Sequence, residues 1–165
     1  MTHDGQLLIA AAGPLVYFLD VGNLIANGPQ SVLGSISDGP GAGSIDVNVT
    51  ADDRWLFVAD ENLNQITVID LDRARSGGYP QDAIVGAIPT GEAPTHVDFS
   101  ADGQWLYSTS EVALPRGKNQ WLLGPLNQHI ALLSCIGVPL GDFIRARRSF
   151  LSISTGEMGL ERSPS

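Results

Sequence analysis

The sequence is poor in cysteine and in basic residues. Cys135 is the single cysteine among 165 residues, so no intrachain disulfide can form and cysteine usage does not indicate a redox compartment. Nine Lys and Arg stand against 18 Asp and Glu, which gives a formal net charge of −9. Nucleic-acid binding needs a basic patch or stripe, so this composition argues against a nucleic-acid partner.

Long apolar runs are also missing. The longest nearly apolar run, 130–140, is shorter than the roughly 20 residues that span a membrane as a helix. We therefore do not expect a membrane partner. The first residues have no basic region followed by an apolar one, so we expect no signal peptide in this chain. If this chain is part of a longer parent protein whose N-terminus carries a signal peptide, that parent would be secreted.

Motifs for nucleotide, metal or nucleophilic chemistry are absent from the sequence. Gly39–Gly43 is rich in glycine, but no helical pattern follows it, so we interpret it as a flexible crossing. The histidines His3, His96 and His129 are scattered along the chain. We expect no cofactor, and we favour a non-enzymatic role for this chain.

What the sequence does contain is a repeat, centred on residues 49–71. Two runs there, 55–59 and 66–71, are rich in Val, Ile, Phe and Trp, which favour strands. Turn-forming residues precede the first run, at Asp52-Asp53, and separate the two runs, at 62–64. The pattern predicts a tight antiparallel meander.

The start of the meander occurs three times in the chain. Residues 50–57 (TADDRWLF) match 100–107 (SADGQWLY) at an offset of 50, and 2–9 (THDGQLLI) at an offset of 48. Later strands recur as well, 17–21 against 68–71 and 32–36 against 84–88. Four strand-like runs in about 50 residues are typical of a propeller blade.

The repeats resemble those of YVTN-type β-propellers of the lactonase-like and quinoprotein-dehydrogenase-like superfamily, which is related to WD-repeat propellers. The residues that carry the resemblance are Gly91–Gly103 (GEAPTHVDFSADG) and Asn64–Asp70 (NQITVID). Ala51 and Ala101 stand where the family pattern has proline. The resemblance covers about residues 1–113 and implies the fold, because this architecture hosts many unrelated functions.

We therefore predict an all-β fold, an incomplete β-propeller of about 2–2.5 four-stranded antiparallel blades. The expected repeats are about 1–36, 45–88 and 95–113. The predicted function is a binding or interaction scaffold without catalysis of its own, for an unidentified protein or small-molecule ligand. The alternative is part of a lactonase-like hydrolase or a quinoprotein-type dehydrogenase with its site in the central channel. Uncovered blade faces also predict self-association.

The last third of the chain departs from the repeat. Residues 1–114 contain 15 acidic and 3 basic residues, whereas residues 115–165 contain 3 acidic and 6 basic residues. We predict a non-repeat tail over 114–165 that is irregular or partly helical. Three interpretations of this tail remain: the product of an altered reading frame or altered splicing, a capping helix at 121–133, and a membrane-attached segment at 121–148.

Two residues are candidates for channel chemistry. The resemblance places the strand that contains His96 at the channel, and the repeat places Asp46 at the matching position of the preceding unit. Such a pair has the side chains for acid–base work. The alternative is that both are solvated edge residues with only structural contacts.

A loop carboxylate set, Asp60, Glu61 and Glu111, has the oxygen ligands that Ca²⁺ prefers. The competing interpretation, which we favour, is turn formation and solubility, so no metal is predicted. Residues that recur in each unit are expected to be structural, because a catalytic residue is needed only once. These are Asp52, Trp55, Asp70, Asp102, Gly103 and Trp105. The outer loops at 23–31 and 73–82 are predicted to be surface excursions.

Overall fold

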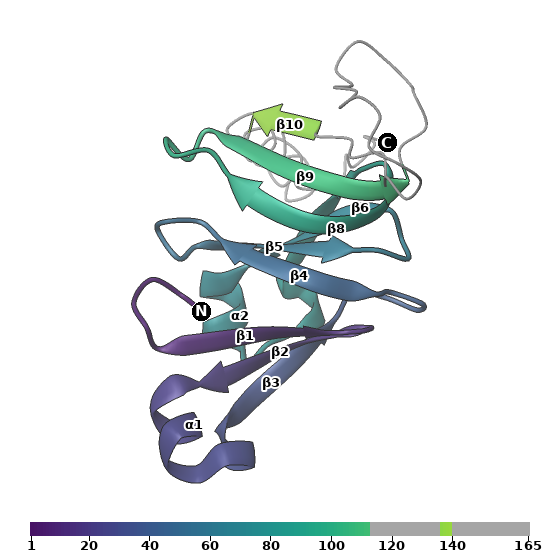
Figure 1. Ribbon diagram of the computed structural model, residues 1–165. Helices are drawn as coiled ribbons and strands as arrows, with labels where there is room; N and C mark the ends of the chain where they lie inside the picture. Colours follow the sequence, from purple (N-terminus) through teal and green to yellow (C-terminus); the bar gives the residue numbers. More distant parts are fainter. Residues whose placement is uncertain (113–135, 140–165) are drawn as a thin grey trace, which may run out of the picture.

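The computed structural model describes residues 1–112 and 136–139. They form three antiparallel sheets that follow one another along the chain and lie face to face, which we call blades 1, 2 and 3 (Figure 1). The predicted all-β, incomplete-propeller fold class is confirmed. In the part of the chain that the structure describes, no helix combines the length and apolar character needed to cross a membrane.

Blade 1 has three strands in the order β1-β2-β3. They are β1 (Leu7–Ala12), β2 (Leu15–Asp20) and β3 (Val32–Ser37). Gly13 joins the first two strands with a φ of 63°, a conformation that glycine adopts without strain. By the sequence repeat, β1 matches the second strand of blade 2, so blade 1 contains the counterparts of strands two to four.

Blade 2 is complete, with four strands in the order β4-β5-β6-β7. They are β4 (Ser44–Val49), β5 (Trp55–Asp60), β6 (Gln65–Asp70) and β7 (Ile84–Pro89). From Leu56 to Asp60 every residue of β5 is buried, as expected for a strand with a blade on each side.

Blade 3 has β8 (Glu92–Phe99), β9 (Trp105–Val112) and β10 (Ile136–Pro139) in the order β10-β9-β8. β10 pairs with β9 in the place that β6 takes beside β5. It lies within the segment predicted as a non-repeat tail and supplies a third strand to this sheet. The predicted capping helix at 121–133 lies outside the described residues, and so does most of the segment 121–148.

The first strands of blades 2 and 3 share an irregularity. In β4 the pairing passes from Ser44–Asp60 to Asp46–Ala59, and in β8 it passes from Pro94–Ser110 to His96–Thr109. One extra residue is therefore accommodated at the same repeat position in each blade, as in a β-bulge. This shared register places Asp46 and His96 at equivalent positions.

The two segments predicted as outer loops are helical, which corrects the sequence interpretation. α1 (Val21–Asn27) and the 3-10 helix η1 (Gly28–Ser31) follow β2, and α2 (Leu71–Gly77) and the 3-10 helix η2 (Gln81–Ala83) follow β6. Each α-helix begins where the strand before it ends in aspartate.

The aspartate carboxylates cap these helices. Asp20 accepts from Asn23 N at 2.5 Å, and Asp70 accepts from Arg73 N at 3.1 Å. Capping satisfies an amide that has no partner within the first turn. The segment after β6 does not lie wholly at the surface, because α2 buries Leu71 and Ala74.

Two apolar layers hold the blades together. The layer between blades 1 and 2 contains Leu7, Ile9, Val16, Phe18, Ile36, Val49, Leu56, Val58, Ile69, Leu71, Ala74 and Ala83. The layer between blades 2 and 3 contains Phe57, Ala59, Ile66, Val68, Ile88, Val97 and Leu106. Blade 2 thus buries one face against each neighbour, and the core lies between the sheets.

Candidate functional site

A hydrogen-bonded turn precedes the second strand of each repeat. In blade 2, Thr50 Oγ1 donates to Asp52 Oδ1 at 2.6 Å and accepts from Trp55 N at 3.0 Å. The same two bonds recur at Thr2, Asp4 and Leu7 and at Ser100, Asp102 and Trp105. Asp52 and Asp102 therefore have local structural contacts, which the repeated sequence anticipates.

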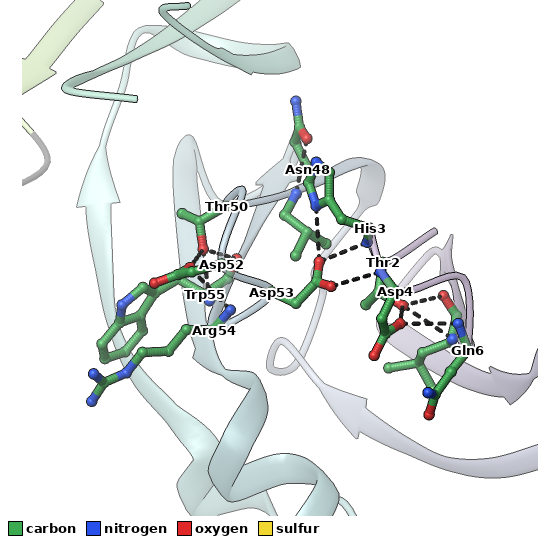
Figure 2. Close-up of polar contacts among 12 residues, drawn as sticks. Thr2, His3, Asp4, Gln6, Asn48, Thr50, Asp52, Asp53, Arg54 and Trp55 are labelled. Carbon is green, nitrogen blue, oxygen red and sulfur yellow. Dashed lines mark hydrogen bonds and ion pairs between the residues drawn. The ribbon is translucent and has the colours of Figure 1, made fainter. Parts of the chain in front are cut away.

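Asp53 departs from this pattern. The matching residues, Gly5 and Gly103, have φ angles of 70° and 65°, and Asp53 adopts 55° without being glycine. Its carboxylate accepts from His3 N at 2.7 Å and from Asp4 N at 2.9 Å, and lies 2.8 Å from His3 Nδ1 (Figure 2). Asp53 thus ties the turn of blade 2 to the turn of blade 1.

The pKa of Asp53 reflects these donors. Partial burial alone would raise the pKa of this carboxyl, but the amides of His3 and Asp4 and the His3 ring together lower it below its ordinary value. The ionised form is the one that accepts all three bonds. The contact therefore works as a junction between blades.

His96 and Asp46 come together across blades 2 and 3. His96 Nδ1 lies 2.7 Å from Asp46 Oδ2, and the same oxygen accepts from Val97 N at 2.9 Å. The side chain of His96 is 58% exposed and that of Asp46 is 29% exposed. The two residues predicted to face one space are paired at the adjacent edges of the two sheets.

This arrangement fixes the orientation of the imidazole ring through its Nδ1 atom. With Nδ1 held by the Asp46 carboxylate, the neutral ring has Nε2 as its acceptor nitrogen. A carboxylate that orients a histidine in this way is a recurring arrangement in general-base catalysis. The pair has the chemistry to move a proton, and the described residues add no metal cluster to it.

A second polar contact continues along the same edge. Asn48 Nδ2 donates to Asp98 Oδ1 at 3.0 Å and to Val97 O at 3.3 Å. Asn48 follows Asp46 by two residues and Asp98 follows His96 by two, so both contacts lie on one face of their strands. Equivalent positions of neighbouring blades therefore bind each other along this edge.

The edge ends in a groove of about 470 Å³ between the turns of blades 2 and 3. Polar groups at its wall come from His3, Asn48, Asp52 and Asp98, and aromatic surface comes from Trp55 and Phe99. Trp55 is half-buried, and the Arg54 guanidinium lies 5.0 Å from its ring centroid. Sequence reasoning missed this groove because it arises from two turns 50 residues apart.

A pair of buried carboxylates, Asp38 and Asp60, lies between the crossing segment and blade 2. Asp60 is fully buried and accepts from Gly43 N at 2.9 Å and from Leu63 N at 3.3 Å. Asp38 accepts from Ser44 Oγ. Within the described residues, Asp38 Oδ1 and Asp60 Oδ2 have no hydrogen-bond partner.

Burial raises the pKa of Asp38 to about 6, the Ser44 hydroxyl opposes this shift, and the Asp60 charge adds to it. No sequence pattern pointed to Asp38, because it lies in a Gly-rich crossing.

The carboxylates considered for Ca²⁺ differ in their surroundings. Asp60 is a buried acceptor of backbone amides, Glu61 is half-buried in the turn after β5, and Glu111 is exposed on β9. In residues 1–112 and 136–139, no three His, Cys, Asp or Glu side chains form a group that could hold a metal ion. Asp60 has a structural role in these contacts.

Comparison with known proteins gives structural neighbours only. No family model matches the chain, and no curated protein sequence matches it. Its structure is similar to Kuenenia stuttgartiensis hydrazine synthase, with a TM-score of 0.57 and 19% identity over 86% of this chain and 32% of that one.

Two lactonase structures are also similar. The periplasmic gluconolactonase PpgL of Pseudomonas aeruginosa gives a TM-score of 0.51 and 24% identity over 67% of this chain and 34% of that one. A putative 6-phosphogluconolactonase from Bacteroides fragilis gives a TM-score of 0.52 and 18% identity over 84% of this chain and 37% of that one. The chain spans about a third of the length of these proteins. Residues 1–112 and 136–139 therefore form part of a β-propeller, with the fold found in lactonase-like proteins.

Proposed function

We propose that this chain is a binding scaffold whose ligand surface is the groove between the turns of blades 2 and 3, without catalysis of its own. The groove is the observation that carries the proposal. Its wall combines aromatic surface from Trp55 and Phe99 with the amide of Asn48 and the carboxylates of Asp52 and Asp98. Apolar surface with a few polar groups is typical of small-ligand sites.

The chemistry of the wall selects the ligand class. Carboxylate and amide oxygens accept hydrogen bonds from hydroxyl groups, and aromatic rings cover the apolar face of a sugar. The carboxylates, together with the acidic character of residues 1–114, repel anions. The proposed ligand is therefore a neutral polyhydroxylated molecule of sugar type.

The contacts of Asp53 support the absence of catalysis. Its carboxylate accepts from the amides of His3 and Asp4. This side chain serves the junction between blades 1 and 2, and a reaction needs groups that can act on a substrate.

The test is an NMR titration of the full chain with D-glucose and, separately, with gluconate. Glucose is expected to shift amide signals in 48–52 and 98–103, and gluconate to shift them less. Ala101→Trp fills the groove from an exposed turn position and is expected to remove the response. Ala87→Trp, at an exposed position on β7, is the matched control and should retain it. Equal responses in the two variants, or none in the native chain, would contradict the proposal.

A second candidate function rests on the pair formed by His96 and Asp46. The proposal is that this pair acts as a general base in lactone hydrolysis, with Nε2 accepting a proton from water and Asp46 holding the ring. In support, the side chains lie 2.7 Å apart with His96 exposed, and two structural neighbours are described as lactonases.

Hydrolysis of glucono-δ-lactone, followed by pH-stat titration, separates the two candidates. General-base catalysis contributes about 10²–10⁴-fold, so His96→Gln should lower any enzymatic rate by that order and Asp46→Asn by less. The scaffold proposal predicts that the native chain and both variants give the uncatalysed rate.

A further inference from the structure

Two buried carboxylates lie close together where the chain crosses from blade 1 to blade 2. Asp38 directly follows β3 and is 8% exposed, and Asp60 ends β5 and is 0% exposed. Asp38 accepts from Ser44 Oγ, and Asp60 Oδ1 accepts from Gly43 N at 2.9 Å. Because Gly43 and Ser44 are consecutive residues, both carboxylates are anchored at the start of β4.

Each carboxylate keeps one buried oxygen without a partner. Among the residues that the structure describes, neither Asp38 Oδ1 nor Asp60 Oδ2 accepts a hydrogen bond. The ion pairs found in that part of the chain involve neither group. A buried carboxylate without a counter-charge is costly, so the arrangement favours a partner of positive charge.

The next blade junction shows that the fold does not need this acidic pair. At the crossing from blade 2 to blade 3, the positions that match Asp38 and Asp60 are Thr90 and Ser110. The backbone bond from Asp38 N to the preceding turn recurs at Thr90 N. The same crossing is therefore built there with neutral side chains, and the two charges at the first crossing are an addition to it.

A further side-chain oxygen lies next to the pair. The carboxamide of Asn62 covers Gly43, because a Cβ added at Gly43 would lie 2.7 Å from Asn62 Nδ2 and 3.3 Å from Asn62 Oδ1. Glycine thus lets the turn after β5 approach the residue whose amide binds Asp60. Half a turn of the carboxamide exchanges its nitrogen and oxygen, so Asn62 can present an oxygen here.

We propose that Asp38 and Asp60 form a Ca²⁺ site, with one cation bound by their free oxygens and the Asn62 carboxamide beside them. Ca²⁺ takes about six to eight oxygen ligands in flexible geometry, including carboxylates, amide carbonyls and water, whereas Mg²⁺ demands a nearly ideal octahedron. Two carboxylates and a carboxamide are ligands of this kind. Their two negative charges balance the charge of the cation.

The site is separate from the groove, because Asp60 lies at the opposite end of β5 from Trp55. It also differs from the set considered in the sequence, since its second carboxylate comes from the crossing. The pKa of Asp38 agrees with the geometry, because burial and the Asp60 charge both raise it. Bound Ca²⁺ would relieve this repulsion and tie the crossing to the end of β5.

The test is calorimetric titration of the EDTA-treated full chain with CaCl₂, together with thermal melts at pH 7. The native chain is expected to bind one Ca²⁺, and its Tm should rise by about 5 °C when Ca²⁺ is about tenfold above its Kd. Mg²⁺ should raise the Tm less. Asp38→Asn and Asp60→Asn should each weaken Ca²⁺ binding at least about tenfold, because each removes a charged ligand.

Asp72→Asn is the matched control. It removes the same charge from an exposed position on α2, which follows the end of β6 that pairs with Trp55 and not with Asp60. It should keep the full response to Ca²⁺, which general screening of an acidic chain would not distinguish from the response of Asp38→Asn.

The order of the melts gives a second readout. Without Ca²⁺, Asp38→Asn should melt above the native chain, because it removes one of two buried charges, and saturating Ca²⁺ should abolish that difference. If Asp60→Asn does not fold, Asp38→Asn decides alone, because its carboxamide still accepts from Ser44. No Ca²⁺ binding by the native chain, or the same rise in Tm for the native chain and Asp38→Asn, would overturn the proposal.

Discussion

The junction between blades 1 and 2 differs from the junction between blades 2 and 3 in what holds it. The first contains the larger apolar layer, the buried face of α2, and a stack of Phe18 on Tyr79 with ring centroids 4.6 Å apart. The second has a smaller layer and polar contacts between edge strands. The repeat thus uses the outer helix α2 at one junction and inner edge residues at the other.

The outer helix makes a close fit at the first junction. Tyr79 follows α2 and lies over Gly34 of β3, where an added Cβ would come within 2.7 Å of the tyrosine ring. Gly34 is therefore required by the approach of the ring and not by its backbone angle. The approach of Tyr79 to blade 1 explains why the segment 73–82, predicted as a surface excursion, packs against the core.

The largest expected effects come from removing one aromatic ring at each junction. Phe18→Ala and Phe57→Ala each delete a fully buried side chain and should cost about 3–5 kcal/mol of unfolding free energy. Amide exchange then separates the junctions. Phe18→Ala should speed exchange mainly in β1–β3, and Phe57→Ala mainly in β8 and β9. The same pattern in both variants would show that the junctions are not independent.

The next effect concerns Asp38, the buried acid of the segment that crosses from blade 1 to blade 2. Native Asp38 keeps its proton up to about pH 6, whereas the unfolded chain loses it near 3.8. The raised pKa means that stability falls as pH rises between these values. Asp38→Asn removes that fall and should add up to about 2–3 kcal/mol above pH 7. At pH 4 it should add almost nothing.

Thermal melts of the native chain and of Asp38→Asn across pH 4–8 measure this difference. A gain that is constant over the whole range would contradict the assignment of the raised pKa to this carboxyl.

A smaller effect is expected at the contact between turns. Asp53→Ala loses three hydrogen bonds, of which each is worth about 0.5–1.5 kcal/mol, and keeps an unfavourable backbone angle. Asp53→Gly loses the same bonds but relieves that angle, which is worth about 1 kcal/mol. We expect a loss of about 2 kcal/mol for alanine and about 1 kcal/mol for glycine. Urea unfolding measures both, and the reverse order would contradict this account.

The smallest effect is expected at the second junction. The pair of His96 and Asp46 is solvent-exposed on the histidine side, so His96→Ala should cost less than about 1 kcal/mol. Asp46→Ala also leaves the amide of the buried Val97 without its acceptor, and should cost about 1–2 kcal/mol. A double-mutant cycle with urea unfolding tests this asymmetry. Equal losses would mean that the amide contact contributes nothing.

The period of the sequence explains which features could be predicted. The three turns and the facing positions of Asp46 and His96 follow from the offset of about 50 residues, because equivalent positions of neighbouring blades meet. The helices could not be found in this way. Each has seven residues, too few for a clear apolar period, and its capping aspartate is also the last residue of a strand.

Other features depend on contacts that no local pattern encodes. Asp38 lies in a Gly-rich crossing, and its burial results from blade 2 closing over it. β10 is separated from β9 by 23 residues and does not match the repeat, so its pairing could not be read from the sequence. Asp53 occupies a position where the other copies have glycine, and only the contact with His3 explains the aspartate.

The central claim is that consecutive blades pack face to face, so that β5 meets β8 and β9 of the next blade. The most direct measurement is the set of nuclear Overhauser contacts of the Phe57 ring in the full chain. The account predicts contacts from this ring to the methyl groups of Val97 and Leu106 and to the ring of Phe99, whose centroid lies 5.4 Å away. Contacts from Phe57 to Leu7 or Ile9 of blade 1 instead would contradict it, because they would place both buried faces in one closed barrel.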